Sequence, residues 1–111
     1  MKILVLEPRR SPYVEEIDGS LESMQDIVGG YIEVTHDSAI EDDAVIICNE
    51  EGKLMGLEEN RIITHGMHMD VICGTCFVCN APQDSEDFEG LTDEQLDYYY
   101  DLYLPYVIVR W

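Results

Sequence analysis

The run that decides the fold is Val71-Ile72-Cys73-Gly74-Thr75-Cys76-Phe77-Val78-Cys79, the longest mainly apolar stretch in the chain. β-branched and aromatic residues are frequent in it, and such residues favour strands. A continuous apolar run of this length is typical of a strand that is buried on both faces. We therefore predict that residues 71–79 form one core strand of a sheet.

Other segments share β-branched or alternating apolar residues that are bounded by turn residues. The predicted strands are Ile3–Leu6, Tyr13–Ile17, Tyr31–Thr35, Ala44–Cys48 and Tyr106–Val109. The segment 53–63 has no clear period and is compatible with a short helix or an irregular stretch.

Two segments carry helix signals instead. Ser20 can cap a helix in which Leu21, Met24, Ile27 and Val28 follow at helical spacing, and two glycines follow Val28. Thr92 and Gln95 have the spacing of a capping box. Leu96, Tyr99, Tyr100 and Tyr103 then form the apolar stripe of a second helix. We predict helices at about 21–28 and 93–103.

Together these elements predict an α+β fold: a single mixed, mainly antiparallel sheet of four to six strands, with the two helices packed on it. No linker, repeat or low-complexity tract divides the chain, so we expect one domain, 1–111.

The charge of the chain is its most unusual property. Its 111 residues include 24 acidic and 6 basic side chains, which gives a net charge of -18. No Lys or Arg lies between Arg61 and Arg110, whereas nine acids do, and eight of the nine lie from Asp84 to Asp101. Self-repulsion on this scale destabilises a compact state. Direct binding to nucleic acid is not expected, because phosphate contacts need Lys and Arg.

The sequence also bears on location. The apolar run Ile3–Leu6 is too short for a signal-peptide core, and no stretch reaches the roughly 20 apolar residues of a membrane span. Four cysteines without a secretory signal indicate free thiols in a reducing compartment. We therefore expect a cytoplasmic protein that does not contact membranes.

Three parts of the chain resemble a known family. Residues 11–33 read SPYVEEIDGSLESMQDIVGGYIE, residues 47–54 read ICNEEGKL, and Gly56-Leu57 and Asn60-Arg61 follow. This pattern resembles a small domain family of unknown function found in phages, plasmids and conjugative elements of bacteria. The resemblance implies a mobile-element setting, in which small acidic accessory proteins often counter host defences. It implies no catalytic residue.

The cysteines offer one candidate site. Cys73, Cys76 and Cys79 are spaced C-x-x-C-x-x-C and could hold zinc or an iron–sulfur cluster together with Cys48 or the nearby His65 and His68. In a strand, however, Cys76 would point to the face opposite Cys73 and Cys79. We therefore predict buried free thiols and no cofactor, with a metal-binding module as the alternative.

The acidic residues offer a second candidate site. Asp93, Asp97 and Asp101 recur every four residues on the helix side away from the tyrosine stripe. Four residues rise about 6 Å along a helix, which is close to the spacing of phosphates along a nucleic-acid strand. The candidate partner-binding residues are Asp84, Glu86, Asp87, Glu89, Asp93, Glu94, Asp97 and Asp101.

These observations favour a non-enzymatic protein that imitates nucleic acid and binds a basic, nucleic-acid-binding host protein. An enzyme is not expected, because no nucleophile elbow or phosphate-binding glycine loop is present. Besides the metal-binding module, an alternative is a structural or regulatory protein of the mobile element whose acids only confer solubility. In that case an apolar patch around Tyr98, Leu102 and Trp111 would matter more. Nothing in the sequence indicates the oligomeric state.

Overall fold

The computed structural model describes residues 1–108, which contain seven strands and two helices. Five strands form one sheet in the order β2-β1-β7-β4-β3. Their bounds are β1 Lys2–Leu6, β2 Tyr13–Glu16, β3 Ile32–Thr35, β4 Ala44–Asn49 and β7 Cys76–Asn80. The remaining strands, β5 Glu59–His65 and β6 His68–Cys73, form a separate two-stranded sheet.

The most apolar runs occupy the middle of the large sheet. Strand β7 pairs with β1 on one side and β4 on the other, so that Val78 lies opposite both Leu4 and Ile46. All three side chains are inaccessible to solvent. Every strand pairing in the described part of the chain is antiparallel. The sheet is therefore ordered by hydrophobicity, with its more polar strands β2 and β3 at the edges.

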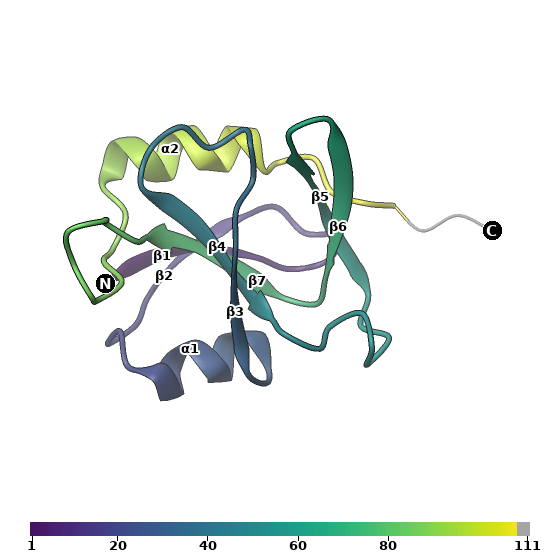
Figure 1. The fold of residues 1–111 in the computed structure, drawn as a ribbon, viewed down its shortest axis with the longest axis horizontal. Coiled ribbons are helices and arrows are strands. Elements are labelled where there is room, and N and C mark those ends of the chain that lie inside the picture. The colour runs from purple at the N-terminus through teal and green to yellow at the C-terminus, as the bar shows by residue number, and fades with distance from the viewer. Residues whose placement is uncertain (109–111) are drawn as a thin grey trace.

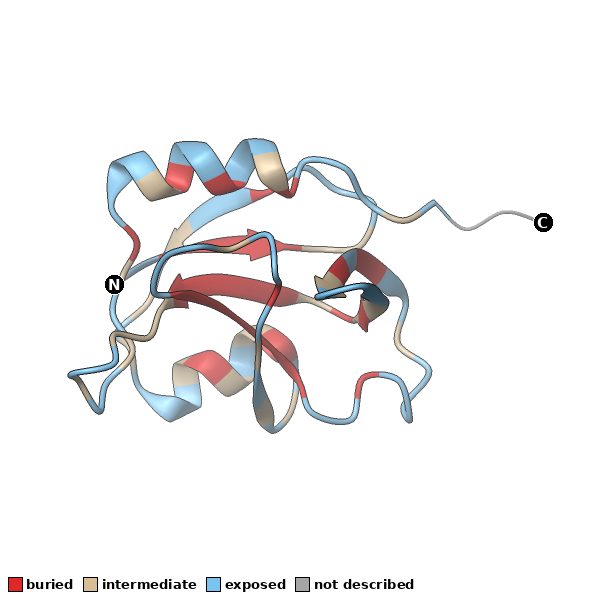
Figure 2. Cartoon of the chain, turned by 45° about the horizontal axis from the view of Figure 1, so that its top comes forward, coloured by how far each residue is buried: buried red, intermediate tan, exposed pale blue. Residues whose placement is uncertain are grey.

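The large sheet is the middle layer of the molecule (Figure 1). Helix α1, Leu21–Val28, covers one face, where Met24 and Val28 pack on Ile3 and Phe77. Helix α2, Asp93–Leu102, and the β5–β6 hairpin share the other face. The core therefore lies on both sides of the sheet, and the helices expose their outer sides (Figure 2).

The helix boundaries follow from local chemistry. The Ser20 hydroxyl accepts a hydrogen bond from the Ser23 amide, and Gly29 ends α1 in the left-handed conformation. Thr92 and Gln95 form a complete capping box at the start of α2. The α+β class, the antiparallel sheet and both predicted helices are confirmed. Within α2, Tyr100 is an exception to the predicted apolar stripe, because it is exposed.

The quoted run 71–79 forms two strands, so the prediction of a single strand was wrong. Strand β6 ends at Cys73, the chain turns at Gly74 with a φ of 88°, and β7 begins at Cys76. Glycine adopts this left-handed conformation without steric cost. The turn places β6 and β7 in different sheets. Because the sequence had been interpreted as one strand over 71–79, the second sheet was not predicted. The predicted strand 106–109 is irregular at 106–108, and residue 109 lies outside the described part.

Candidate functional site

All eight predicted partner-binding acids are exposed. They lie on the loop between β7 and α2 and on the outer side of α2, and we call them the acidic surface. Leu96 and Tyr99 fix the orientation of α2, because both are buried against the sheet. The row Asp93, Asp97 and Asp101 therefore projects into solvent, as the helical spacing predicted.

Polar contacts fix the loop that carries the first half of this surface. The Asn80 and Glu89 backbones exchange two hydrogen bonds, at 2.8 and 2.9 Å, and close the loop at its base. The Asn80 side-chain amide donates to the Gly90 carbonyl and to Gln95 Oε1. Since Gln95 also belongs to the capping box of α2, the loop and the helix are joined at one point.

A third acidic segment, residues 41–43, lies beside α2, and this proximity was not predicted from the sequence. The Gln95 amide donates to Asp42 at 3.0 Å, and the Tyr99 hydroxyl donates to the same carboxylate. Burial alone would raise the pKa of Asp42, but these hydrogen bonds and that from the Ala44 amide lower it. Exposed Glu41 and Asp43 flank Asp42, so the negative surface extends from α2 onto this loop.

Almost no residue of the acidic surface forms an ion pair with a cation in the described part of the chain. Lys2 lies 3.6 Å from Asp93, and this ion pair is exposed. The other two ion pairs in residues 1–108 join Arg9, between β1 and β2, to Glu58, just before β5, and Lys53 to Asp70 of β6. Asp93 is thus the one residue of the acidic surface with an ion-pair partner in residues 1–108.

The cysteines do not come together as a metal site within residues 1–108, where no group of three or more His, Cys, Asp or Glu side chains is placed to hold a metal ion. Cys76 packs on the α2 side of the sheet and Cys79 on the α1 side. All four thiols are free, and burial of Cys48, Cys76 and Cys79 is confirmed, whereas Cys73 is half-buried. Burial raises the pKa of Cys79 to about 12, which disfavours the reactive thiolate.

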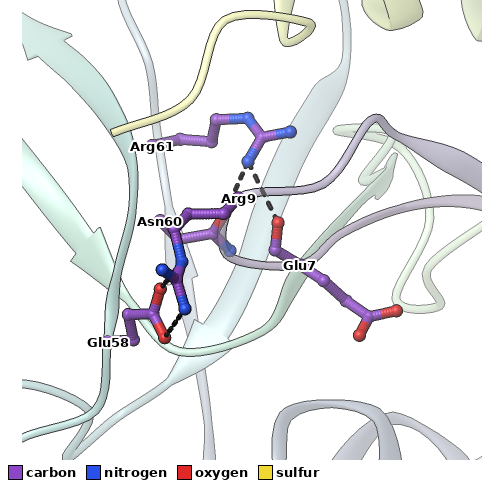
Figure 3. A network of polar contacts seen from close by, with 5 residues as sticks. All are labelled: Glu7, Arg9, Glu58, Asn60 and Arg61. Atoms are coloured by element: carbon purple, nitrogen blue, oxygen red, sulfur yellow. Dashed lines mark hydrogen bonds and ion pairs between the residues drawn. The ribbon is translucent and has the colours of Figure 1, made fainter. Parts of the chain in front are cut away.

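Two buried charges were missed by sequence reasoning. Arg61 is 1% exposed, and its guanidinium donates to the carbonyls of Glu7, Arg10 and Tyr103 and to the side chain of Asn60. Figure 3 shows its contacts with Glu7 and Asn60. Burial lowers the pKa of this guanidinium. No carboxylate within residues 1–108 forms an ion pair with it.

The second buried charge is Asp37, which is 6% exposed. Its carboxylate accepts hydrogen bonds from the Ala39 amide, from the amide and hydroxyl of Thr64, and from the Tyr103 hydroxyl. Burial raises the pKa of Tyr103, and the hydrogen bond to Asp37 raises it further. Asp37 and Arg61 line one cavity of about 240 Å³.

A larger groove of about 560 Å³ separates β3 and β4 from the hairpin. Its walls include His36, His65, Cys48 and Cys73, together with the ion pair between Lys53 and Asp70. Cys48, His65 and Cys73, three of the candidate metal ligands, thus line the same groove, but the described residues present no metal-binding group there.

Comparison with protein families gives one match, which spans residues 1–104 and is described as "Domain of unknown function (DUF3846)". The chain belongs to this family. The predicted membership of a family of unknown function is confirmed. Comparisons with curated proteins and with solved structures give no significant match.

The DUF3846 match includes the whole acidic surface and both buried charges. The segment 105–108, which contributes Pro105, Tyr106 and Val107 to the small cavity, lies beyond it. No helix of the described DUF3846 chain is long and apolar enough to cross a membrane.

Proposed function

We propose that this protein is a non-enzymatic accessory protein of a bacterial mobile element, such as a phage or plasmid. Acting in the cytoplasm, it presents the acidic surface to the basic groove of a host nucleic-acid-binding protein, for example a defence enzyme. The observation that carries this proposal is the projection of eight exposed carboxylates from α2 and its preceding loop, with Lys2 as their one ion-pair partner in residues 1–108.

The arrangement of these carboxylates supports mimicry of a phosphate backbone. Asp93, Asp97 and Asp101 share one side of α2, with a rise of about 6 Å between neighbours. Glu41 and Asp43 add negative charge beside this row. A surface of one charge sign steers an oppositely charged partner and accelerates association, with strong dependence on salt. Affinity therefore rests on many weak contacts rather than on one residue.

The row also has a cost within the helix. Like charges four residues apart destabilise a helix by a few tenths of a kcal/mol. Asp93 offsets this, because it lies in the first turn, where the helix dipole favours a negative charge. Asp97 and Asp101 gain no such benefit near the other end. Asp97→Asn with Asp101→Asn is therefore the cleanest variant, since it should leave the fold intact or slightly more stable.

The test begins with capture from a bacterial host lysate at low salt, with mass spectrometry to identify what binds. Titration of the captured complex with duplex DNA and with single-stranded RNA then asks whether the ligands compete. We expect the partner to be a nucleic-acid-binding protein that releases this chain as nucleic acid is added. A partner that binds both at once would exclude mimicry.

Helix α1 supplies a matched control. Glu22 and Asp26 are exposed, lie four residues apart and are on the opposite side of the sheet from α2. Glu22→Gln with Asp26→Asn removes the same charge as the α2 variant. We expect the α2 variant to weaken binding several-fold more. Equal losses would show that only net charge matters, and unchanged binding by both would favour acidity as a solubility device.

A further inference from the structure

The small cavity between α2 and the β5–β6 hairpin is lined by two buried groups of opposite charge. Arg61 and Asp37 both contribute to its wall, yet their charged atoms are not within ion-pair distance of each other. Arg and Asp are almost never fully buried unless they are paired. In a chain with 24 acids and 6 bases, a buried guanidinium without a carboxylate partner in residues 1–108 calls for an explanation.

Each buried group retains capacity for one more partner. A guanidinium has five N–H donors. In Arg61, Nε and both N–H groups of Nη1 are used, but Nη2 donates only to the Arg10 carbonyl among residues 1–108. Asp37 Oδ2 accepts only from the Tyr103 hydroxyl, whereas Oδ1 carries the other hydrogen bonds. One donor and one acceptor therefore remain.

Tyr103 sets the distance between the two groups. Its carbonyl accepts from Arg61 Nε at 2.7 Å, and its hydroxyl donates to Asp37 at 2.8 Å. The charges therefore lie at opposite ends of one tyrosine residue. That gap is too long for a direct ion pair, but a small molecule with a charge at each end can bridge it.

The remaining cavity wall is mainly apolar. Ile62, Leu102, Pro105 and Val107 contribute to it, and the Tyr106 ring lies 5.5 Å from the Arg61 guanidinium carbon. The volume of about 240 Å³ is below the roughly 300–1,000 Å³ of pockets for drug-sized ligands. The space suits a molecule of amino-acid size.

We propose that this cavity binds a small zwitterion of the α-amino-acid class, with its carboxylate at Arg61 and its ammonium group at Asp37. A simple anion would be repelled by Asp37, and a simple cation by Arg61. A zwitterion satisfies both, and each desolvated charge then gains the opposite partner that it lacks. This site is separate from the acidic surface and does not depend on the proposed function.

The test is an NMR titration of the full chain with glycine, L-alanine, L-leucine and L-glutamate. Propionate and ethylamine serve as probes with one charge only. We expect at least one amino acid to produce saturable shifts of backbone amides around the cavity, including those of Thr64 and Tyr103. The one-charge probes should bind about tenfold more weakly or worse, which corresponds to a loss of about 1.4 kcal/mol.

Substitutions at Ala39 and at Asp37 locate the binding. Ala39 lines the cavity without contributing a charge, so Ala39→Phe should occupy the space and abolish the shifts, whereas Ala39→Ser should retain them. Asp37→Asn keeps the shape but removes the negative charge, and should lose selectivity for zwitterions. If Asp37→Asn fails to fold, the Ala39 pair still decides the question. No saturable response to any amino acid, or an equal response to propionate or ethylamine, would overturn the proposal and leave a water-filled cavity.

Discussion

Backbone carbonyls and neutral side chains, rather than opposite charges, hold the buried polar residues of this fold. Arg61 donates to three carbonyls and one amide oxygen, and Asp37 accepts from amides and hydroxyls. Such charge-assisted hydrogen bonds are stronger than neutral ones. Their removal leaves a buried charge with one partner fewer, which is costly.

Sequence reasoning recognised the buried thiols but not these charges. Cys48, Cys76 and Cys79 lie in apolar runs, so their burial follows from their immediate neighbours. Arg61 has partners 42 to 54 residues away in the chain, apart from Asn60, and the Asp37–Tyr103 contact spans 66 residues. No local pattern carries information about contacts over such separations.

Tyr103→Phe tests the contact with Asp37. The variant keeps the ring but leaves the buried carboxylate without one donor, so we expect the free energy of unfolding to fall by about 1–3 kcal/mol. Tyr98→Phe is the control, because Tyr98 is 61% exposed and surface changes usually stay within about 0.5 kcal/mol. Urea denaturation of both variants measures the difference, and similar values for the two would contradict the role of Asp37.

The difference in the free energy of unfolding between the wild type and Tyr103→Phe should change with pH in one direction. The folded-state pKa of Tyr103 is raised by burial and by Asp37, so its stabilising contribution is complete below the unfolded pKa of about 10. Above that pH the unfolded tyrosine ionises and the contribution is lost. The gap between the wild type and Tyr103→Phe should therefore narrow as the pH rises above 10, as measured by urea denaturation at each pH.

At the scale of elements, helices were more predictable than the boundary between two strands. Ser20 and Thr92 identify the helix starts because capping is a local interaction. Gly74 and Thr75 interrupt the apolar run 71–79 only briefly, so the spacing of apolar residues along the sequence could not separate β6 from β7. The deciding feature is the left-handed backbone of Gly74, and glycine tolerates but does not require that conformation.

Gly74→Ala tests this turn. An added Cβ would lie 2.7 Å from Leu57 Cδ1, and the φ of 88° is unfavourable for alanine. We expect a cost of about 1–2 kcal/mol from the backbone and a further 1–3 kcal/mol or so from overpacking. Gly66→Ala is the control, because Gly66 has a φ of 64° but open space around its Cα. Thermal melts should show a clearly larger loss for Gly74→Ala, and equal losses would mean that Leu57 moves freely.

For the whole molecule, charge and fold are partly in conflict. The chain carries a net charge of -18 and has principal extents of 43 × 26 × 24 Å. The apolar sheet core offsets the repulsion. The sequence alone predicted the repulsion and the clustering of acids from Asp84 to Asp101, but the position of Glu41 and Asp43 beside α2 needed the three-dimensional structure. That position adds further negative charge around α2.

Salt should therefore stabilise the free protein while it weakens the proposed complex. At 0.01 M ionic strength the screening length is about 30 Å, so most acids repel one another across the molecule, whereas at 0.1 M it is about 10 Å. We expect the melting temperature to rise by several degrees over this range, since about 1 kcal/mol corresponds to roughly 4–8 °C for a domain of this size. Calorimetry in increasing NaCl measures the rise, which should level off once screening is complete.

A gain that instead continued in proportion to salt into the molar range would point to exclusion of ions from the protein surface. No gain at all would show that the repulsion around α2 costs the fold nothing, and that the acids are as well tolerated there as on any solvated surface.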